Sequence, residues 1–232
     1  MFTKQKVVLS ADDYGREGLI SLVKKIGGKV YCVKIHNLYD QYGPQIVKDL
    51  REAGAKKVWI DAKLHDIPNT VKLRAAAIAS SGADILTVHA SGGVEMLKGA
   101  KEGFGKGKVF AVTALTSLDD NAIKNIYNAQ DAKELVGRLA VLVKESGVDG
   151  LVCSPHEIVM LREKSEFDSL ELVIPGIRSA GVDSNDQKRF DTPGNALKAG
   201  ANFLVMGRQI TKSADPVAAL ESLDKEISEV LK

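Results

Sequence analysis

Eight short apolar segments recur along the 232-residue chain, and each gap between them is long enough for a helix. They cover residues 7–11, 30–35, 57–62, 85–90, 109–115, 150–154, 170–175 and 203–207. Between them lie stretches with helical periodicity, such as GLISLVKKIG and AKELVGRLAVLVKESG, several of which end at a glycine. Strands that alternate with helices pair in parallel through right-handed crossovers, and eight such units favour a closed barrel over an open sheet. We therefore predict an α/β fold, a (β/α)8 TIM barrel, with residues 1–232 as a single domain.

Charge and hydropathy exclude several classes of protein. The formal net charge is +2, and acidic and basic residues are mixed along the chain, so neither a nucleic-acid-binding stripe nor a polybasic membrane patch is expected. No apolar run approaches the roughly twenty residues needed to span a bilayer. The first residues, MFTKQKVVLS, lack the apolar core of a signal peptide, and Cys32 and Cys153 both lie inside apolar runs. We expect a cytoplasmic protein that binds neither nucleic acid nor membrane.

Polar residues at the C-terminal ends of the predicted strands are the candidates for chemistry, because reactive groups of such barrels project from these ends and the following loops. The candidates are Asp12, Lys34, Asp61, Lys63, Asp66, His89, Thr116, Arg178, Gln187 and Arg208.

The segment WIDAK at the third strand places charged residues among apolar ones, as does CVKI at the second. An unpaired charge in such surroundings would cost several kcal/mol. Side chains alternate along a strand, so Asp61 and Lys63 share a face, and we expect them to be neighbours at the barrel mouth if Trp59 also points inward. The structural alternative is a buried salt bridge that closes the strand end.

The segment DAKLHDIPNT resembles the signature of the orotidine 5′-monophosphate decarboxylase family, which has the form Asp-x-Lys-x-x-Asp-Ile-Pro-x-Thr. Further segments resemble that family in the same order: LTVHASGG, AVTALTSL, DGLVCSPHE, PGIRSAGVDSNDQKR and KAGANFLVMGRQITKSADP. The resemblance covers nearly the whole chain. The Asp-x-Lys-x-x-Asp pattern alone is shared by related phosphosugar barrels, whereas the full ordered set is specific.

The resemblance implies conversion of orotidine 5′-monophosphate to uridine 5′-monophosphate without a cofactor. Loss of carbon dioxide leaves a vinyl carbanion that no adjacent carbonyl delocalises, so a nearby cation is needed. Lys63 is similar to the lysine that stabilises this charge and protonates carbon 6. Asp61 would lie beside the departing carboxylate. Lys34 and Asp66 would complete an alternating set of charges that keeps the lysine protonated.

The resemblance also implies a twofold homodimer. In that family the second aspartate of the motif enters the neighbouring subunit's site, which here means Asp66 together with Ile67 and Thr70. A monomer should then be nearly inactive.

A second cluster fits a phosphate group. The loops after the seventh and eighth strands commonly form a phosphate site in such barrels, and they contain PGIRSAGVDSNDQ and MGR here. Suitable donors are the backbone amide of Gly207, the guanidinium of Arg208 and the side-chain amide of Gln187. The resemblance assigns them this role and implies that Arg178 moves with the loop that closes over the phosphate. The alternative for Arg208 is an exposed surface arginine.

Some positions leave alternatives open. By resemblance Asp12 binds the ribose, with Asp13 as a competitor, although Asp12 could also be a helix N-cap. Thr116 resembles the residue that reads the pyrimidine edge, with Ser117 as its alternative. His36 departs from the glycine usual in the family.

We expect structural parts for His65 and His89, with direct catalysis as the alternative for His89. We predict no metal ion, since the lysines beside the aspartates already supply positive charge. Two alternative functions remain: a magnesium-dependent phosphosugar decarboxylase or aldolase on the same barrel, and a non-catalytic nucleotide-binding barrel.

Overall fold

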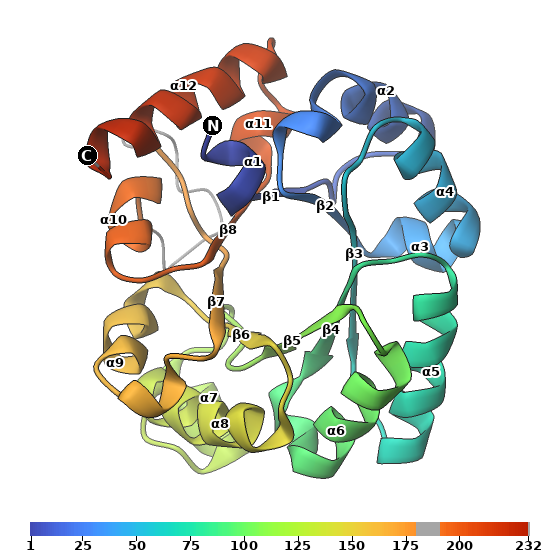
Figure 1. Ribbon diagram of the computed structural model, residues 1–232. Coiled ribbons are helices and arrows are strands. Elements are labelled where there is room, and N and C mark those ends of the chain that lie inside the picture. The colour runs from blue at the N-terminus through green and yellow to red at the C-terminus, as the bar shows by residue number, and fades with distance from the viewer. Residues whose placement is uncertain (180–190, 232) are drawn as a thin grey trace.

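The structure, a computed structural model, describes residues 1–179 and 191–231, and its strands form a closed parallel barrel (Figure 1). Each strand pairs with the next one in the sequence, and β1 pairs with β8 to close the ring. The predicted (β/α)8 barrel is therefore confirmed. The strands are β1 (Val7–Ser10), β2 (Cys32–Ile35), β3 (Val58–Leu64), β4 (Ile85–His89), β5 (Lys108–Val112), β6 (Gly150–Val152), β7 (Glu171–Ile174) and β8 (Phe203–Met206).

Helices follow the strands, and most of them form a ring outside the barrel (Figure 1). The α-helices are α1 (Thr3–Lys6), α2 (Arg16–Ile26), α3 (Asn37–Tyr42), α4 (Pro44–Glu52), α5 (Pro68–Ser80), α6 (Gly93–Phe104), α7 (Asp120–Tyr127), α8 (Ala132–Ser146), α9 (Ile158–Arg162), α10 (Pro193–Lys198), α11 (Arg208–Thr211) and α12 (Pro216–Val230). Helix α1 precedes the first strand, and the backbone N–H of Thr3 donates to Asp224 Oδ1 of α12 at 2.9 Å. This bond ties the beginning of the chain to its last helix.

The core has two layers, as the alternation of side chains along each strand requires. One layer lies between the strands and the helices and contains most of the buried Val, Leu and Ile side chains. The other fills the barrel and includes Trp59, Phe110 and Phe203. Trp59 is 2% exposed, and its Nε1 donates to Thr87 Oγ1 of β4 at 2.6 Å. The indole is thereby fixed inside the barrel, as the inward face predicted for β3 requires.

Strand β3 is longer than the segment predicted from the sequence, because it continues to Leu64. Its register with β4 shifts between Ile60 and Leu64, and Lys63 has a φ of 46°. A left-handed backbone is uncommon for a residue with a side chain and marks local strain. The irregularity lies at the end of the barrel where the sequence predicts the chemistry.

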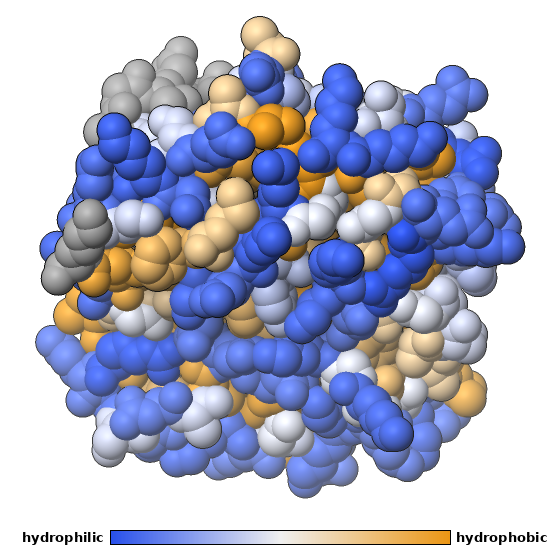
Figure 2. Space-filling model, turned by 45° about the horizontal axis from the view of Figure 1, so that its top comes forward, coloured by the Kyte–Doolittle hydropathy of each residue, from blue (hydrophilic) through white to orange (hydrophobic). Residues whose placement is uncertain are grey.

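The outer surface is mostly hydrophilic on the face that Figure 2 shows, with hydrophobic residues in smaller areas between the hydrophilic ones. Within residues 1–179 and 191–231, none of the helices is both long and apolar enough to cross a membrane.

Candidate active site

Carboxylate and ammonium groups alternate across the C-terminal ends of β1, β2 and β3. Lys34 Nζ lies 3.1 Å from Asp12 Oδ1 and 2.9 Å from Asp61 Oδ2. Lys63 Nζ lies 2.8 Å from the same Asp61 oxygen. The predicted neighbourhood of Asp61 and Lys63 is thus confirmed. We call this set the charge row; its members are Asp12, Lys34, Asp61 and Lys63.

Strand alternation and register explain why these side chains meet. Ser10 pairs with Lys34 across β1 and β2, and Lys34 pairs with Trp59 across β2 and β3. Residues on this face of the strands point into the barrel. Asp12 and Asp61 lie two residues beyond Ser10 and Trp59, so they are on the same face and at the barrel mouth. The charge row contributes to the lining of a cavity of about 660 Å³ at this end of the barrel, a size typical of small-molecule sites.

Burial makes the charge row electrostatically strong. Burial alone would raise the pKa of Asp61, but the adjacent Lys34 and Lys63 charges outweigh it and hold that pKa well below its usual range. Burial would likewise lower the pKa of Lys34, which is 6% exposed, yet Asp61 and Asp12 raise it overall. Both groups are therefore charged at neutral pH, and each cation is held by a carboxylate.

The backbone of Lys63 is strained and interrupts the regular pairing at the end of β3. With its φ of 46°, the residue lies within the register shift against β4, and its side chain is 38% exposed toward the cavity that it lines. The ammonium group of Lys63 can therefore contact a ligand in the cavity while it stays paired with Asp61. Strain of this kind is frequently found at ligand-binding and catalytic positions.

Asp66 does not join the charge row of its own chain. Its side chain is exposed, and its Oδ1 accepts the backbone N–H of Ile67 at 2.7 Å. Among the described residues no ion pair links it to Lys63. Ile67 is 66% exposed, and Thr70 lies half-buried in the first turn of α5. Asp66 and Ile67 therefore face outward from this subunit, and Thr70 is partly accessible.

The predicted phosphate-binding residues that the structure describes follow β7 and β8 and lie at the same cavity as the charge row. Arg178, Gly207 and Arg208 all line it, and Arg208 is half-buried at the start of α11 rather than fully exposed on the surface. The backbone N–H of Arg178 donates to the Asp191 carbonyl at 3.0 Å, which joins the chain on either side of residues 180–190. Gln187 lies outside the described residues.

Gly207 permits a close approach between β8 and β1. A Cβ atom at this position would lie 3.1 Å from the backbone oxygen of Ser10. The absence of a side chain therefore keeps the backbone at the cavity wall accessible, as a site for a phosphate requires.

Gln209 and Ser10 are among the cavity-lining residues that were not predicted from the sequence. Gln209 Nε2 donates to Ser179 Oγ at 2.6 Å, and its Oε1 accepts the Ser179 N–H at 3.0 Å, so α11 is joined to the loop after β7. Ser10 Oγ donates to Asp12 Oδ2 at 2.7 Å. Strand alternation could have identified Ser10, whereas the position of Gln209 one residue beyond Arg208 was the only signal for it.

The structure bears on the alternatives left open. Asp12 contacts Lys34, whereas Asp13, which also lines the cavity, lies 3.7 Å from Lys212. Thr116 lines the cavity, and Ser117 is not among the residues that do. These observations favour Asp12 and Thr116 as the ligand contacts.

His36 is part of the site. Its Nδ1 accepts the backbone N–H of Asn37 at 2.6 Å, so Nε2 carries the proton of the neutral ring and points to Asp12 Oδ1 at 3.2 Å. The histidine that departs from the family's usual glycine thus orients a member of the charge row.

His89 and His65 lie beside the charge row, with their ring centroids 5.5 Å apart. Burial lowers the pKa of His89, and the nearby His65 and Lys63 lower it further. His89 is therefore neutral at pH 7, which fits the structural part expected for it.

A metal ion would have to compete with the lysines of this site. Oxygens of Asp12 and Asp61 already accept from ammonium groups. In the part of the chain that the structure describes, no three His, Cys, Asp or Glu side chains are grouped as metal ligands. The expectation of a metal-free site stays a prediction for experiment.

Comparison with known proteins adds an independent finding. The family model described as "Orotidine 5′-phosphate decarboxylase / HUMPS family" matches residues 5–223. The orotidine 5′-phosphate decarboxylase of Shewanella sediminis is 39% identical over 228 residues, which cover 96% of this chain and 97% of that protein.

Solved structures give the same result. The orotidine 5′-phosphate decarboxylase from Lactobacillus acidophilus has a TM-score of 0.81 and 35% identity, covering 96% of this chain and 99% of that one. An uncharacterized conserved protein from Geobacillus kaustophilus has a TM-score of 0.80 and 33% identity, covering 95% and 99%.

Proposed function

Because this chain belongs to the orotidine 5′-phosphate decarboxylase / HUMPS family, we propose that it converts orotidine 5′-monophosphate to uridine 5′-monophosphate in pyrimidine biosynthesis. The observation that carries the proposal is the charge row, in which Asp61 anchors the ammonium group of Lys63 at the mouth of the barrel. The proposed activity is that of a metal-free carboxy-lyase.

The reaction places a specific demand on Lys63. When the bond between carbon 6 and the carboxylate breaks, carbon dioxide leaves and the electron pair stays on carbon 6 in the plane of the ring. The ammonium group of Lys63 stabilises this charge and then transfers a proton to carbon 6, which leaves the lysine neutral until solvent reprotonates it. Lys63 is thus both the electrostatic stabiliser and the general acid.

Asp61 and Lys34 prepare the site before substrate binds. The ionised carboxylate of Asp61 lies where the substrate carboxylate is lost, so it disfavours the charged ground state more than the transition state. Lys34 is buried between Asp12 and Asp61 and holds both carboxylates in place. A site whose charges are fixed in advance needs little reorganisation during the reaction.

The remaining cavity residues bind the rest of the nucleotide. We assign the phosphate to Arg208, the Gly207 backbone, Arg178 and Gln187, the last of which lies outside the described residues. Asp12 binds the ribose, and Thr116 binds the edge of the pyrimidine. Binding energy from the distant phosphate can then favour closure of the site and raise the rate, in addition to the affinity.

A homodimer completes the site in this proposal. The exposed Asp66 and the 66% exposed Ile67 are available to the neighbouring subunit, together with Thr70. An exposed isoleucine next to an acidic residue of the signature is well placed for a subunit interface. We further propose a cytoplasmic location, which agrees with two buried cysteines that form no disulfide.

The first test is the fall in absorbance of orotidine 5′-monophosphate on addition of purified protein in excess chelator. We expect rapid loss of absorbance. Activity that disappears with chelator and returns with Mg²⁺ on a phosphosugar would instead indicate the metal-dependent alternative.

Lys63→Ala separates catalysis from binding. Turnover should fall at least about 10⁴-fold, since a general acid and an electrostatic stabiliser are both lost. Nucleotide binding should remain, as followed by the fluorescence of Trp59, the chain's single tryptophan, which lines the cavity. Lys48→Ala, at an exposed position on α4, is the control that keeps full turnover. Unchanged turnover in Lys63→Ala would remove the assigned role.

A further inference from the structure

A second cavity, of about 570 Å³, lies at the N-terminal end of the barrel, opposite the charge row. Its lining comes from α1 and from residues at or just before the starts of β2, β3, β5, β7 and β8. Its charged members are five lysines and one carboxylate: Lys4, Lys6, Lys56, Lys57, Lys108 and Glu171. None of these residues takes part in the reaction proposed above.

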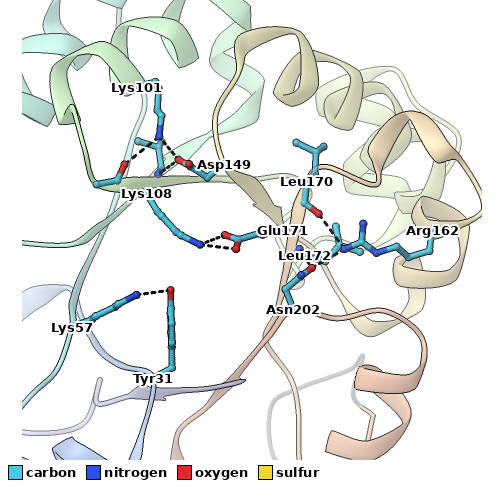
Figure 3. Close-up of polar contacts among 12 residues, drawn as sticks. Tyr31, Lys57, Lys101, Lys108, Asp149, Arg162, Leu170, Glu171, Leu172 and Asn202 are labelled. Atoms are coloured by element: carbon cyan, nitrogen blue, oxygen red, sulfur yellow. Dashed lines mark hydrogen bonds and ion pairs between the residues drawn. The ribbon is translucent and has the colours of Figure 1, made fainter. Parts of the chain in front are cut away.

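Two half-buried lysines at this end of the barrel, Lys101 and Lys108, have a carboxylate partner. Lys101 Nζ lies 2.6 Å from Asp149, and Lys108 Nζ lies 2.6 Å from each oxygen of Glu171, as Figure 3 shows. Lys57 differs from them. Among the described residues it has no ion pair, and its Nζ donates to the hydroxyl of Tyr31 at 3.1 Å.

The groups around Lys57 are held in place by aromatic stacking. Its Nζ lies 4.3 Å from the centroid of the Tyr31 ring, which stacks on Phe203 at 4.3 Å between centroids. Lys108 Nζ lies 5.5 Å from the Phe203 centroid. The two ammonium groups are thus positioned by one aromatic pair, and Figure 3 shows Tyr31, Lys57, Lys108 and Glu171 close together. A prearranged site loses less conformational entropy when a ligand binds.

Charge decides the class of ligand. The single carboxylate in the lining is occupied by Lys108, so the cavity offers a ligand mainly positive charge and hydrogen-bond donors. The Tyr31 hydroxyl accepts from Lys57 and retains its own proton for donation. The exposed Lys4 and Lys56 add charge at the rim. A ligand with one negative charge could pair with only one or two of these ammonium groups. A chain of phosphates carries several negative charges and can pair with several of them.

We propose that this N-terminal cavity binds a small polyanion that carries several phosphate groups. Its volume is within the range of small-molecule sites. Lys57 and Tyr31 form the floor of the site, and the lysines of α1 and Lys56 form its rim. The site is separate from the phosphate-binding residues assigned above, which lie at the opposite end of the strands.

The test is calorimetric titration of the full chain with inorganic tripolyphosphate at low ionic strength. We expect binding that survives Arg208→Ala, a variant that weakens the phosphate site at the other end. Lys57→Met keeps the aliphatic stem and should weaken binding by about tenfold or more, because a hydrogen bond to a charged group is lost. Lys48→Met, at an exposed lysine outside the cavity, is the matched control and should bind as the unaltered protein does.

A second variant keeps the test decisive if Lys57→Met does not fold. The exposed Lys56→Met leaves the contact between Lys57 and Tyr31 intact and should weaken binding about two- to fivefold, less than Lys57→Met does. Titration with ATP identifies the source of the phosphates: tighter binding than tripolyphosphate indicates a nucleotide, and equal binding indicates an inorganic chain. The proposal is overturned if tripolyphosphate does not bind, if Arg208→Ala abolishes binding while Lys57→Met retains it, or if Lys48→Met weakens binding as much as Lys57→Met.

Discussion

Asp61 accepts hydrogen bonds from two ammonium groups, Lys34 and Lys63, and its side chain is 9% exposed. Loss of its charge would leave two cations close together with only Asp12 to balance them. Such a change affects the stability of the fold as well as the reaction, because a buried cation without its partner is costly. A residue that we assign to the reaction therefore also has a structural role.

Asp61→Asn should lower the free energy of unfolding by about 3 kcal/mol at pH 7. The pKa of Asp61 is lower in the folded protein than in the unfolded chain, so its ionised form stabilises the fold above the unfolded pKa of about 4 and this contribution declines as the pH falls further. The difference between variant and parent should thus be constant from pH 8 to 5 and shrink below pH 4. Urea unfolding across this range measures it, with the exposed Asp120→Asn as a control that changes stability by less than about 1 kcal/mol. A difference that grows in acid would contradict this account.

His36 orients Asp12, which we assign to the ribose. His36→Ala should raise KM about three- to tenfold, the effect of one lost hydrogen bond to a charged group, and change kcat less than about twofold. His36→Gln retains a donor of similar reach and should restore much of the lost affinity. Steady-state kinetics of the three proteins test this, and an equal loss in Ala and Gln variants would show that ring packing, rather than the bond to Asp12, is what matters.

Strand β3 shows what could and could not be predicted from the sequence. The alternation of WIDAK placed Asp61 and Lys63 on one face, since side chains alternate along any strand. The left-handed Lys63 and the register shift beside it were not predictable, because lysine has no preference for positive φ and the shift depends on pairing with β4. In contrast, the outward position of Ile67 could be anticipated only through family resemblance, since an isoleucine is more often buried.

Arg162 joins a segment that follows it closely in the sequence to one that lies 38 to 40 residues further along. Its guanidinium donates to the carbonyls of Gly200, Phe167 and Leu170 and to Asn202 Oδ1, so it connects α9 to the residues before β7 and β8 (Figure 3). Burial lowers the pKa of this guanidinium, which nevertheless stays charged at any physiological pH. One side chain thus fixes the spacing of two strands at the end of the barrel remote from the charge row.

Arg162→Met should lower the free energy of unfolding by about 3 kcal/mol, because several acceptors lose their donor together. The matched control is Arg138→Met on α8, whose 54% exposed guanidinium pairs with Glu134 four residues earlier and should contribute less than about 1 kcal/mol. Denaturant unfolding of both variants gives the comparison. Equal losses would mean that the bonds of Arg162 contribute no more than an ordinary surface pair.

For the molecule as a whole, the rhythm of eight apolar segments was sufficient to predict the closed barrel, because buried parallel strands are apolar along their length. The same reasoning could not find the N-terminal cavity. Its lysines are dispersed in the sequence from Lys4 to Lys108, and each one alone has the pattern of a solvated surface residue. Only the closure of the barrel brings them together, so a site of this kind requires the structure.

The proposed dimer can be tested through two residues of the signature, because Lys63 lines the cavity of its own subunit and Asp66 is exposed on the outside. If each site uses its own lysine and the neighbour's aspartate, Lys63→Ala and Asp66→Ala should each be nearly inactive alone. In a heterodimer of the two variants, the subunit with Lys63 receives an intact Asp66, whereas the other site lacks both groups.

Random exchange of equal amounts gives heterodimers as half of all dimers, each with one complete site, so about a quarter of the parental activity should return. The measurement is decarboxylation by the two variants after mixing under conditions that allow subunits to exchange, with each variant exchanged against itself as the control. If Asp66 acted within its own subunit, no heterodimer site would contain both groups and the mixture would stay inactive. Recovery of activity would therefore establish both the dimer and the direction in which Asp66 crosses its interface.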